Sequence, residues 1–241
     1  MSRNRWQAVK TNIHLNDNST SEHTTDKLFK LRPFLGSLSN NLQKIPIDEK
    51  VCVDGQIIPF KGGHSLKVHV KNKPKNWGYK VFARCDCSDV LLDFEIYTGK
   101  GDDSEIPDIG VSGNVVIRLT EVLQRHMNHK VLWQLVQECE FELQKMGIQR
   151  LWTVRPNRLP GCSFINEMKR QGRGTVEEKV TSVEGVEIIA LKWYDNKRVQ
   201  LVSSFAGAYP TYTVQRWDRN EKKSIQVQCP SAVVIYRVVG K

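Results

Sequence analysis

The chain has 241 residues, which is enough to bury a sizeable hydrophobic core in one or two domains. Its hydrophobic content of 39% and charged content of 26% are ordinary for a globular protein. No apolar run approaches the roughly 20 residues that cross a bilayer, and the first six residues lack the apolar stretch of a signal peptide. We therefore expect neither a membrane span nor a secretory signal. The net charge of +10 and the pI of about 9.3 favour an anionic partner, most often nucleic acid.

The six cysteines are spaced in a way that predicts reduced thiols and no metal centre. No two of them form a C-x-x-C pair, so the spacing of a zinc ribbon is absent. Cys85 and Cys87, one residue apart, make a poor chelate for a tetrahedral ion on their own. Reduced thiols fit a cytosolic or nuclear protein.

The N-terminal quarter is expected to lead from a polar segment through a helix into a first strand. Residues 1–25 are rich in Asn, Ser and Thr and lack periodicity, which predicts a loose lead-in. Residues 26–44 carry leucines spaced by three and four, which predicts a helix that Pro33 kinks or divides. Residues 51–60 form a β-branched and aromatic run, which predicts a strand. Asp54 lies inside this strand, where a buried carboxylate must be paired or bound to a metal.

Two more strands are predicted directly after the first. Residues 78–85 and 90–97 have strand composition and are bounded by turn residues. Three consecutive strands, the first of which carries an Asp, are typical of the opening of a ribonuclease H-like fold. The connecting segment 64–77 is basic and contains Trp77, which we expect to anchor this loop to the protein body rather than to stack on a base.

The middle of the chain is expected to supply helices and the remaining strands of the sheet. Residues 99–112 have the Gly, Asp and Ser composition of a loop, and residues 114–128 have the pattern of an amphipathic helix. A fourth strand is predicted to begin at Lys130, but helical spacing over 134–146 leaves its length open. A shortened fourth strand would split the sheet and expose its edges. Residues 148–154 return to strand composition.

The C-terminal third is predicted to consist mainly of strands. Residues 159–188 are expected to form loops and a short helix, and two hairpins follow, 186–193 with 198–203 and 212–217 with 224–228. The predicted fold class is α/β, an incomplete ribonuclease H-like mixed sheet flanked by helices, with a β-rich insertion in the C-terminal half. The expected divisions are a lead-in (1–25), a partial core (26–158), an insertion-like region (159–236) and a divergent tail (237–241).

Several stretches form one recognisable pattern in collinear order: 16–18, 26–33, VDGQIIPFKG at 53–62, NKPKNWGYK at 72–80, DFEIYTG at 93–99, TVRPNR at 153–158, KWYDNK at 192–197, 203–204, 229–230 and Tyr236. Together they resemble the piggyBac transposase family over most of residues 12–236. The resemblance implies a nuclear, DNA-binding protein with a ribonuclease H-like core, in which several aspartates and Mg²⁺ cut and join DNA. Most of the family's N-terminal region and its cysteine-rich zinc domain have no counterpart here. The chain is therefore expected to be a truncated, degenerate member.

Asp54 matches the first catalytic aspartate of that family, while Gly55 stands where the family commonly has Glu. Two Mg²⁺ ions roughly 4 Å apart activate the attacking oxygen and stabilise the leaving one. Because Mg²⁺ is held by carboxylates together with phosphates and water, a single Asp cannot assemble the pair. The resemblance therefore implies that Asp54 is a relic, which would bind a metal only if a second carboxylate completes the site.

The other catalytic acids of the family have no recognisable match. The second should follow the fourth strand, but the interval 132–142 contains no Asp. The remaining acids should lie beyond the point where the resemblance ends, at Tyr236. Asp195 belongs to a turn, which explains it structurally. Three glutamates in the interval match no family position: Glu138, Glu140 and Glu142.

Two basic groups are candidates for contact with DNA phosphates, which would depend on salt and not on sequence. The first contains no Asp or Glu and consists of Lys61, Lys67, Lys71, Lys73, Lys75, Lys80 and Arg84. The second consists of Arg150, Arg155, Arg158, Lys169, Arg170 and Arg173, of which we select Arg155 and Arg158 as DNA-binding residues. The alternative for each group is an ordinary solvated surface.

Three hypotheses follow. The first is a piggyBac-derived protein that has lost strand transfer, needs no cofactor and binds DNA nonspecifically. The second is an active Mg²⁺-dependent transposase or nuclease that uses Asp54 with an unrecognised acid such as Glu138. The third is an interaction module that forms a homo-oligomer or pairs with a full-length relative and regulates it.

Overall fold

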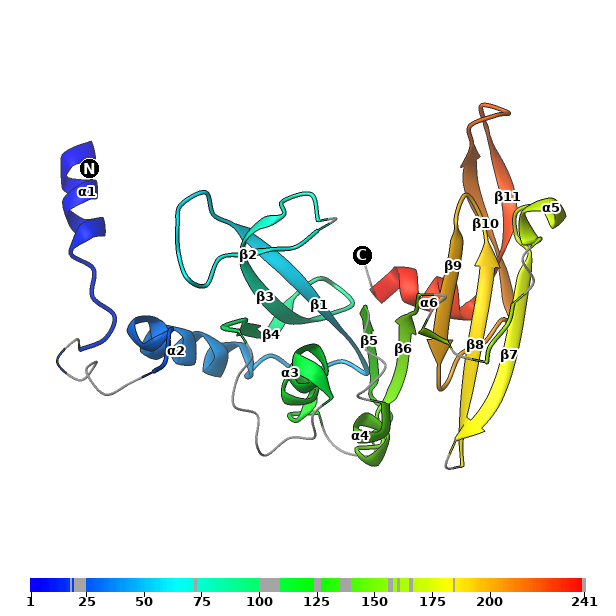
Figure 1. Cartoon of the computed structure of the whole chain (residues 1–241), viewed down its shortest axis with the longest axis horizontal. Helices are drawn as coiled ribbons and strands as arrows, with labels where there is room; N and C mark the ends of the chain where they lie inside the picture. The colour runs from blue at the N-terminus through cyan, green and yellow to red at the C-terminus, as the bar shows by residue number, and fades with distance from the viewer. Residues whose placement is uncertain are drawn as a thin grey trace.

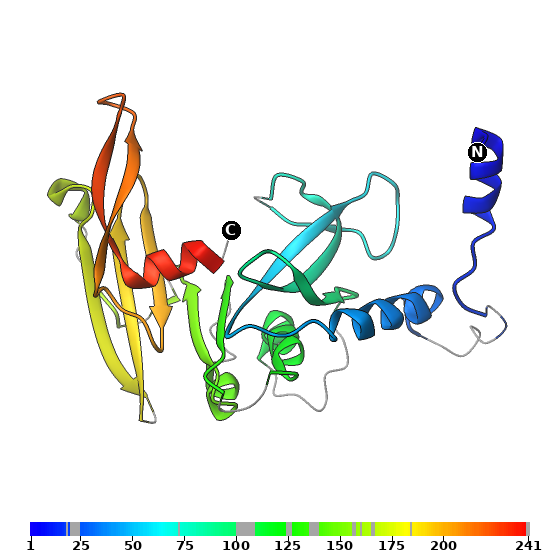
Figure 2. The same cartoon turned by 180° about the vertical axis from the view of Figure 1, so that it is seen from behind.

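The structure is a computed structural model of the whole chain, viewed from two sides in Figures 1 and 2. No helix among the described residues combines the length and the apolar character needed to cross a membrane. The residues that the structure describes are 1–17, 19, 25–71, 73–99, 109–123, 127–134, 140–155, 158–159, 161–164, 167–183 and 185–239.

The N-terminal segment contains more helix than expected. Helix α1 (Arg3–Thr11) forms within the segment predicted to be loose, and Ser2 caps it by accepting a hydrogen bond from the Arg5 backbone N–H. The helix buries none of its residues and stands apart from the sheet (Figure 1). A short 3₁₀ turn, η2 (Phe29–Leu31), and α2 (Arg32–Leu42) follow. Pro33 lies in the first turn of α2, where its missing N–H costs nothing, so it begins a helix and does not kink one.

Among the described residues, nine strands form one mixed sheet. Its order is β2-β3-β1-β5-β6-β9-β8-β7, with β4 also paired to β3. The bounds are β1 Lys50–Pro59, β2 Val68–His69, β3 Trp77–Asp86, β4 Leu91–Ile96, β5 Lys130–Gln134, β6 Gln149–Thr153, β7 Val176–Val183, β8 Val186–Tyr194 and β9 Arg198–Ser203.

The fourth strand of the core is intact, so the sheet is not split. Strand β5 pairs in parallel with β1 on one side and with β6 on the other. The series β4-β3-β1-β5-β6 is the order expected of a ribonuclease H-like core. Residues 135–139, over which a longer helix was predicted, lie outside the described residues, and α4 is described only over Glu140–Lys145.

Three C-terminal strands, β7, β8 and β9, extend the core sheet. Strand β9 pairs antiparallel with β6, and β8 and β7 continue the sheet beyond it. The prediction of loops over 159–188 is wrong for β7, which pairs with β8 along its whole length after the short helix α5 (Met168–Gln171). The charged side chains of this strand obscured its alternating pattern. Strands β10 (Thr211–Asp218) and β11 (Lys223–Pro230) form the second predicted hairpin as a separate two-stranded sheet.

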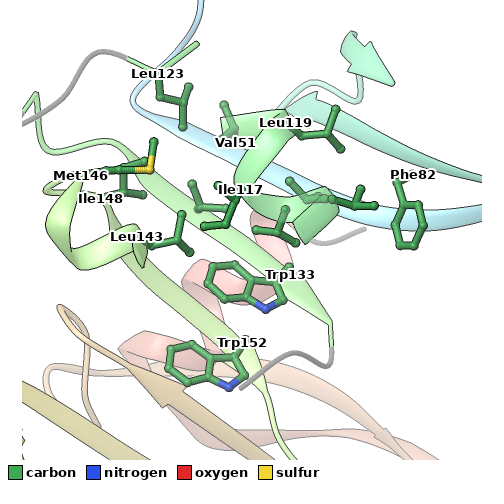
Figure 3. Close-up of a cluster of buried hydrophobic side chains, with 14 of the residues drawn as sticks. Val51, Phe82, Ile117, Leu119, Leu123, Trp133, Leu143, Met146, Ile148 and Trp152 are labelled. Atoms are coloured by element: carbon green, nitrogen blue, oxygen red, sulfur yellow. The ribbon is translucent and has the colours of Figure 1, made fainter. Parts of the chain in front are cut away.

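Helices cover both faces of the central strands. One core cluster contains Val131, Trp133 and residues of α3 (Gly110–Thr120), and Figure 3 shows its side chains. A second cluster contains Leu132 with residues of the hairpin and of α6 (Ser231–Val239). Alternate residues of β5 therefore face two different cores, which is why its three central residues are all apolar.

Helix α6 includes the described part of the predicted tail at 237–241. It begins directly after β11 and crosses the sheet, where it contacts β1, β6 and β9 (Figure 2). Its buried residues Ala232 and Val233 join the second core. The apolar run before Tyr236 is thus a core helix, and the described part of the tail, residues 237–239, completes its last turn.

Candidate nucleic-acid interface

Asp54 lies in β1 at the wall of a small cavity of about 210 Å³. Its Oδ2 is 3.5 Å from Lys73 Nζ, which gives a weak ion pair because both side chains remain partly exposed. Trp133 and Phe82 supply apolar walls, and Lys80 lines the same cavity. The site thus combines one carboxylate with two ammonium groups.

The neighbouring strand supplies no second carboxylate beside Asp54. The parallel register of β1 and β5 ends at the pair Val53–Trp133, so Gln134 is the residue that follows in β5. Within the described ranges, no group of three or more His, Cys, Asp and Glu side chains is arranged to hold a metal ion. These residues do not fit the pair of Mg²⁺ ions that strand transfer requires.

Of the three glutamates near β5, the structure describes the side chain of Glu142. Glu138 lies outside the described residues, and the side chain of Glu140 is not described. Glu142 accepts a hydrogen bond from Lys145 Nζ at 2.8 Å on the outside of α4. Its carboxylate is therefore engaged in a surface ion pair.

Five lysines lie in the segments that join β1 to β2 and β2 to β3, and we call them the β1–β3 basic surface. Lys61, Lys71 and Lys75 are exposed, and none has a carboxylate within ion-pair distance in the described part of the chain. No Asp or Glu occurs between Lys61 and Arg84. The surface therefore carries positive charge with little internal neutralisation. Its members are Lys61, Lys67, Lys71, Lys73 and Lys75.

The loop is held by its own contacts. Lys67 Nζ donates hydrogen bonds to the backbone carbonyls of Lys61 and Gly62, at 3.3 and 2.9 Å. The same ammonium lies 5.2 Å from the ring of Trp77, which packs on His69. Trp77 is 53% exposed, and its contacts with Lys67 and His69 brace the loop internally.

The structure removes Arg84 from the predicted DNA-binding residues and limits the contact that Lys80 can make. Arg84 is fully buried in β3, and its Nη1 donates to the carbonyl of Leu119 at the end of α3. A phosphate cannot reach it. Lys80 is half-buried above the Phe82 ring, and burial lowers the pKa of its ammonium. Because side chains alternate along β3, Lys80 and Arg84 both point toward the α3 side of the sheet. The sequence did not show this, because both cations belong to one continuous run of basic residues.

The second basic group is dispersed by the fold. Arg150 is buried and donates from Nη2 to Gln144 Oε1 at 3.1 Å. Arg173 is held in ion pairs within the C-terminal half. Arg155 and Arg158 are exposed after the end of β6, so they remain available to an anionic ligand.

Asp195 has a structural role, as its position in a turn predicted, and the structure shows which residues it contacts. Its Oδ1 accepts from Arg173 Nε at 2.7 Å, and its Oδ2 is 3.3 Å from Arg216 Nε. Arg173 also donates to Asp218. The two arginines and two aspartates therefore form one network that joins the end of β8 to the β10–β11 hairpin, which local spacing did not reveal.

The described cysteines are free thiols. Cys52 and Cys85 are directly paired residues of β1 and β3. Burial raises the pKa of the Cys52 thiol to about 12, so it is not a nucleophile near neutral pH. Cys139 lies outside the described residues.

The fold defines the class of protein. One chain from the cryo-EM structure of a piggyBac transposase synaptic complex with hairpin DNA superposes with a TM-score of 0.71. The two chains are 18% identical, and the match covers 99% of this chain and 48% of that one. The likeness shows that the two share a fold, with a large mixed sheet flanked by helices.

The sequence defines the family. The profile of the family described as Transposase IS4 matches residues 1–238. The human PiggyBac transposable element-derived protein 3 is 29% identical over 245 residues, and the human PiggyBac transposable element-derived protein 2 is 26% identical over 244. The chain therefore belongs to the piggyBac-type transposase family. Each match covers 98% of this chain, which spans 40% of the length of these two relatives.

Proposed function

We propose that this transposase-derived chain binds the DNA backbone through the β1–β3 basic surface and performs no strand transfer. The observation that carries the proposal is the group of exposed lysines Lys61, Lys71 and Lys75 on a loop that contains no acid. Cations grouped in this way attract phosphates regardless of base sequence. DNA binding makes the nucleus the proposed location.

The neighbouring residues support contact with a nucleic acid. Lys67 is fixed by two carbonyls and thereby holds the loop that carries Lys61. The exposed ring of Trp77 offers an apolar surface beside these charges, which suits contact with a sugar or an unpaired base. Arg155 and Arg158 are additional exposed cations that an extended anion can reach.

The proposal that chemistry is lost rests on the surroundings of Asp54. The ammonium of Lys73 is the partner of the carboxylate, and the residue that follows Trp133 in the adjacent strand is an amide. An ammonium supplies charge but cannot activate an attacking water or stabilise a leaving oxygen as a metal ion does. A single carboxylate paired with Lys73 therefore does not provide the charge needed to hold two Mg²⁺ ions.

Replacement of Lys61, Lys71 and Lys75 by alanine is expected to weaken binding to any short duplex and to flatten its salt dependence. Each phosphate contact contributes about 0.9 to the slope of log K against log salt, so the slope should fall by up to about 3. Fluorescence anisotropy with a labelled duplex between about 50 and 200 mM salt measures this change. The matched control replaces three exposed lysines elsewhere, Lys30, Lys44 and Lys222. Equal losses in both triple variants would show that only net charge matters and that the loop is not the interface.

Calorimetric titration of MgCl₂ or MnCl₂ into the protein with a short duplex is expected to show no saturable site. The Asp54→Ala variant should give the same heats as the unaltered chain, because the described residues include no cluster of acids that could hold a metal ion with Asp54. A saturable signal that Asp54→Ala removes would instead mean that another carboxylate completes a metal centre. That outcome would favour the alternative of a Mg²⁺-dependent nuclease.

A further inference from the structure

A second positively charged site lies at the other end of the sheet, far along the chain from the β1–β3 basic surface. It is a cavity of about 740 Å³, within the range of small-molecule binding sites. Four exposed cations line it from four different elements: Lys169 on α5, Lys197 in the β8–β9 turn, Arg219 in the β10–β11 turn and Arg237 on α6. We call this the β8–β9 cavity.

The four cations have no ion-pair partner in the described part of the chain, unlike Arg173, Asp195 and Asp218, which also line the cavity. The two carboxylates that line the cavity, Asp195 and Asp218, are both bonded to Arg173. The negative charges of Asp195 and Asp218 are therefore already paired with that of Arg173. The positive charge of the rim remains uncompensated, and low-dielectric walls around such charges strengthen their attraction for an anion.

Hydrogen bonds hold part of the cavity wall rigidly. Arg173 is mostly buried and donates hydrogen bonds to Asp195 in the turn after β8 and to Trp217 and Asp218 in β10, so its guanidinium is fixed in place. Trp193 is fully buried and its Nε1 donates to the Gln228 carbonyl at 2.9 Å. The guanidinium of Arg237 lies over this indole at 5.8 Å, which positions it at the wall of the cavity. The fold therefore holds part of the rim in place before any ligand binds.

We propose that the β8–β9 cavity binds a compact polyphosphate, an anion that carries several phosphate groups on a small scaffold. Cations that surround a hollow from several elements suit a ligand that fills it, whereas an extended backbone follows cations along a ridge or groove. Two of the cations are arginines, whose planar donors match phosphate oxygens in pairs. The site is separate from the proposed DNA surface and does not depend on it.

Isothermal titration of sodium tripolyphosphate into the full chain is the test, at matched ionic strength with sodium chloride as the blank. We expect saturable binding, and weaker binding of orthophosphate because one phosphate group engages fewer cations. Arg219→Ala and Lys197→Ala should each weaken tripolyphosphate binding about tenfold, the effect of one charged hydrogen bond. Both side chains are exposed, so the fold should be unaffected, which circular dichroism verifies.

The matched control is Lys222→Ala. Lys222 is exposed in the same β10–β11 turn as Arg219 but does not line the cavity. Binding within about twofold of the unaltered chain is expected, since an exposed charge outside the cavity contributes little. Equal weakening by Lys222→Ala, or no saturable heat, would overturn the proposal. Loss of duplex binding in Arg219→Ala without any tripolyphosphate binding would identify the cavity as a nucleic-acid contact instead.

Discussion

Replacing Trp152 by alanine is expected to lower the free energy of unfolding by about 3–5 kcal/mol. Trp152 is 2% exposed in β6, and its ring stacks on that of Trp133 in β5 with centroids 5.5 Å apart and planes 4° from parallel (Figure 3). Truncation removes the whole indole of Trp152 from this stack and leaves a cavity that the two paired strands cannot close. The cost falls on β5 and β6, and β6 is the core strand that pairs with β9 of the C-terminal extension.

Urea unfolding followed by circular dichroism measures the effect, and the chain offers a matched control. Trp217 in β10 is 57% exposed, so Trp217→Ala makes the same chemical change outside the core. We expect that control to change stability by no more than about 0.5 kcal/mol. If the two variants were equally stable, the stacked pair would not be part of a packed core.

Replacing Asp195 by alanine is expected to destabilise the fold by about 3 kcal/mol, the lower end of the cost of breaking a buried ion pair. Removal of this carboxylate leaves Arg173 with Asp218 alone and Arg216 with no ion-pair partner among the described residues. Both guanidiniums are mostly buried, so water only partly replaces the lost partner. The hairpin β10–β11 should loosen from β8, because the network joins them.

Thermal and urea unfolding, with hydrogen exchange of the hairpin amides, test this expectation. Glu187→Ala is the control, because Glu187 is an exposed carboxylate on the same strand β8. Its removal should change stability by no more than about 0.5 kcal/mol. A loss below about 1 kcal/mol for Asp195→Ala, or no change in hairpin exchange, would mean that apolar packing alone holds the hairpin.

The family and the core strands could be predicted from the sequence alone. The strand with Asp54 at its centre, the next two strands and both C-terminal hairpins formed where composition and turn residues placed them. These are local signals: β-branched runs bounded by Gly, Asn and Asp favour strands whatever surrounds them. The family resemblance is confirmed by the match over residues 1–238.

Strand β7 and helix α6 show where local pattern was insufficient. The charged run around Glu177 and Lys179 resembles a loop by composition, and it becomes a strand because β8 supplies a partner along its whole length. The segment around Val233 becomes a helix that covers the second core. Both elements obtain their stability from non-local packing, which propensity does not report.

The sequence by itself determined the family, the positive charge of the β1–β3 loop and the absence of a second Asp after the fourth strand, because each depends only on which residues occur in which order. Tertiary structure alone decided which cations are accessible. Lys75 is exposed and Arg84, nine positions later in the same basic run, is fully buried, because the alternating faces of β3 put the guanidinium beneath α3. Charge can be counted along a chain, but burial is set by the elements that pack against it.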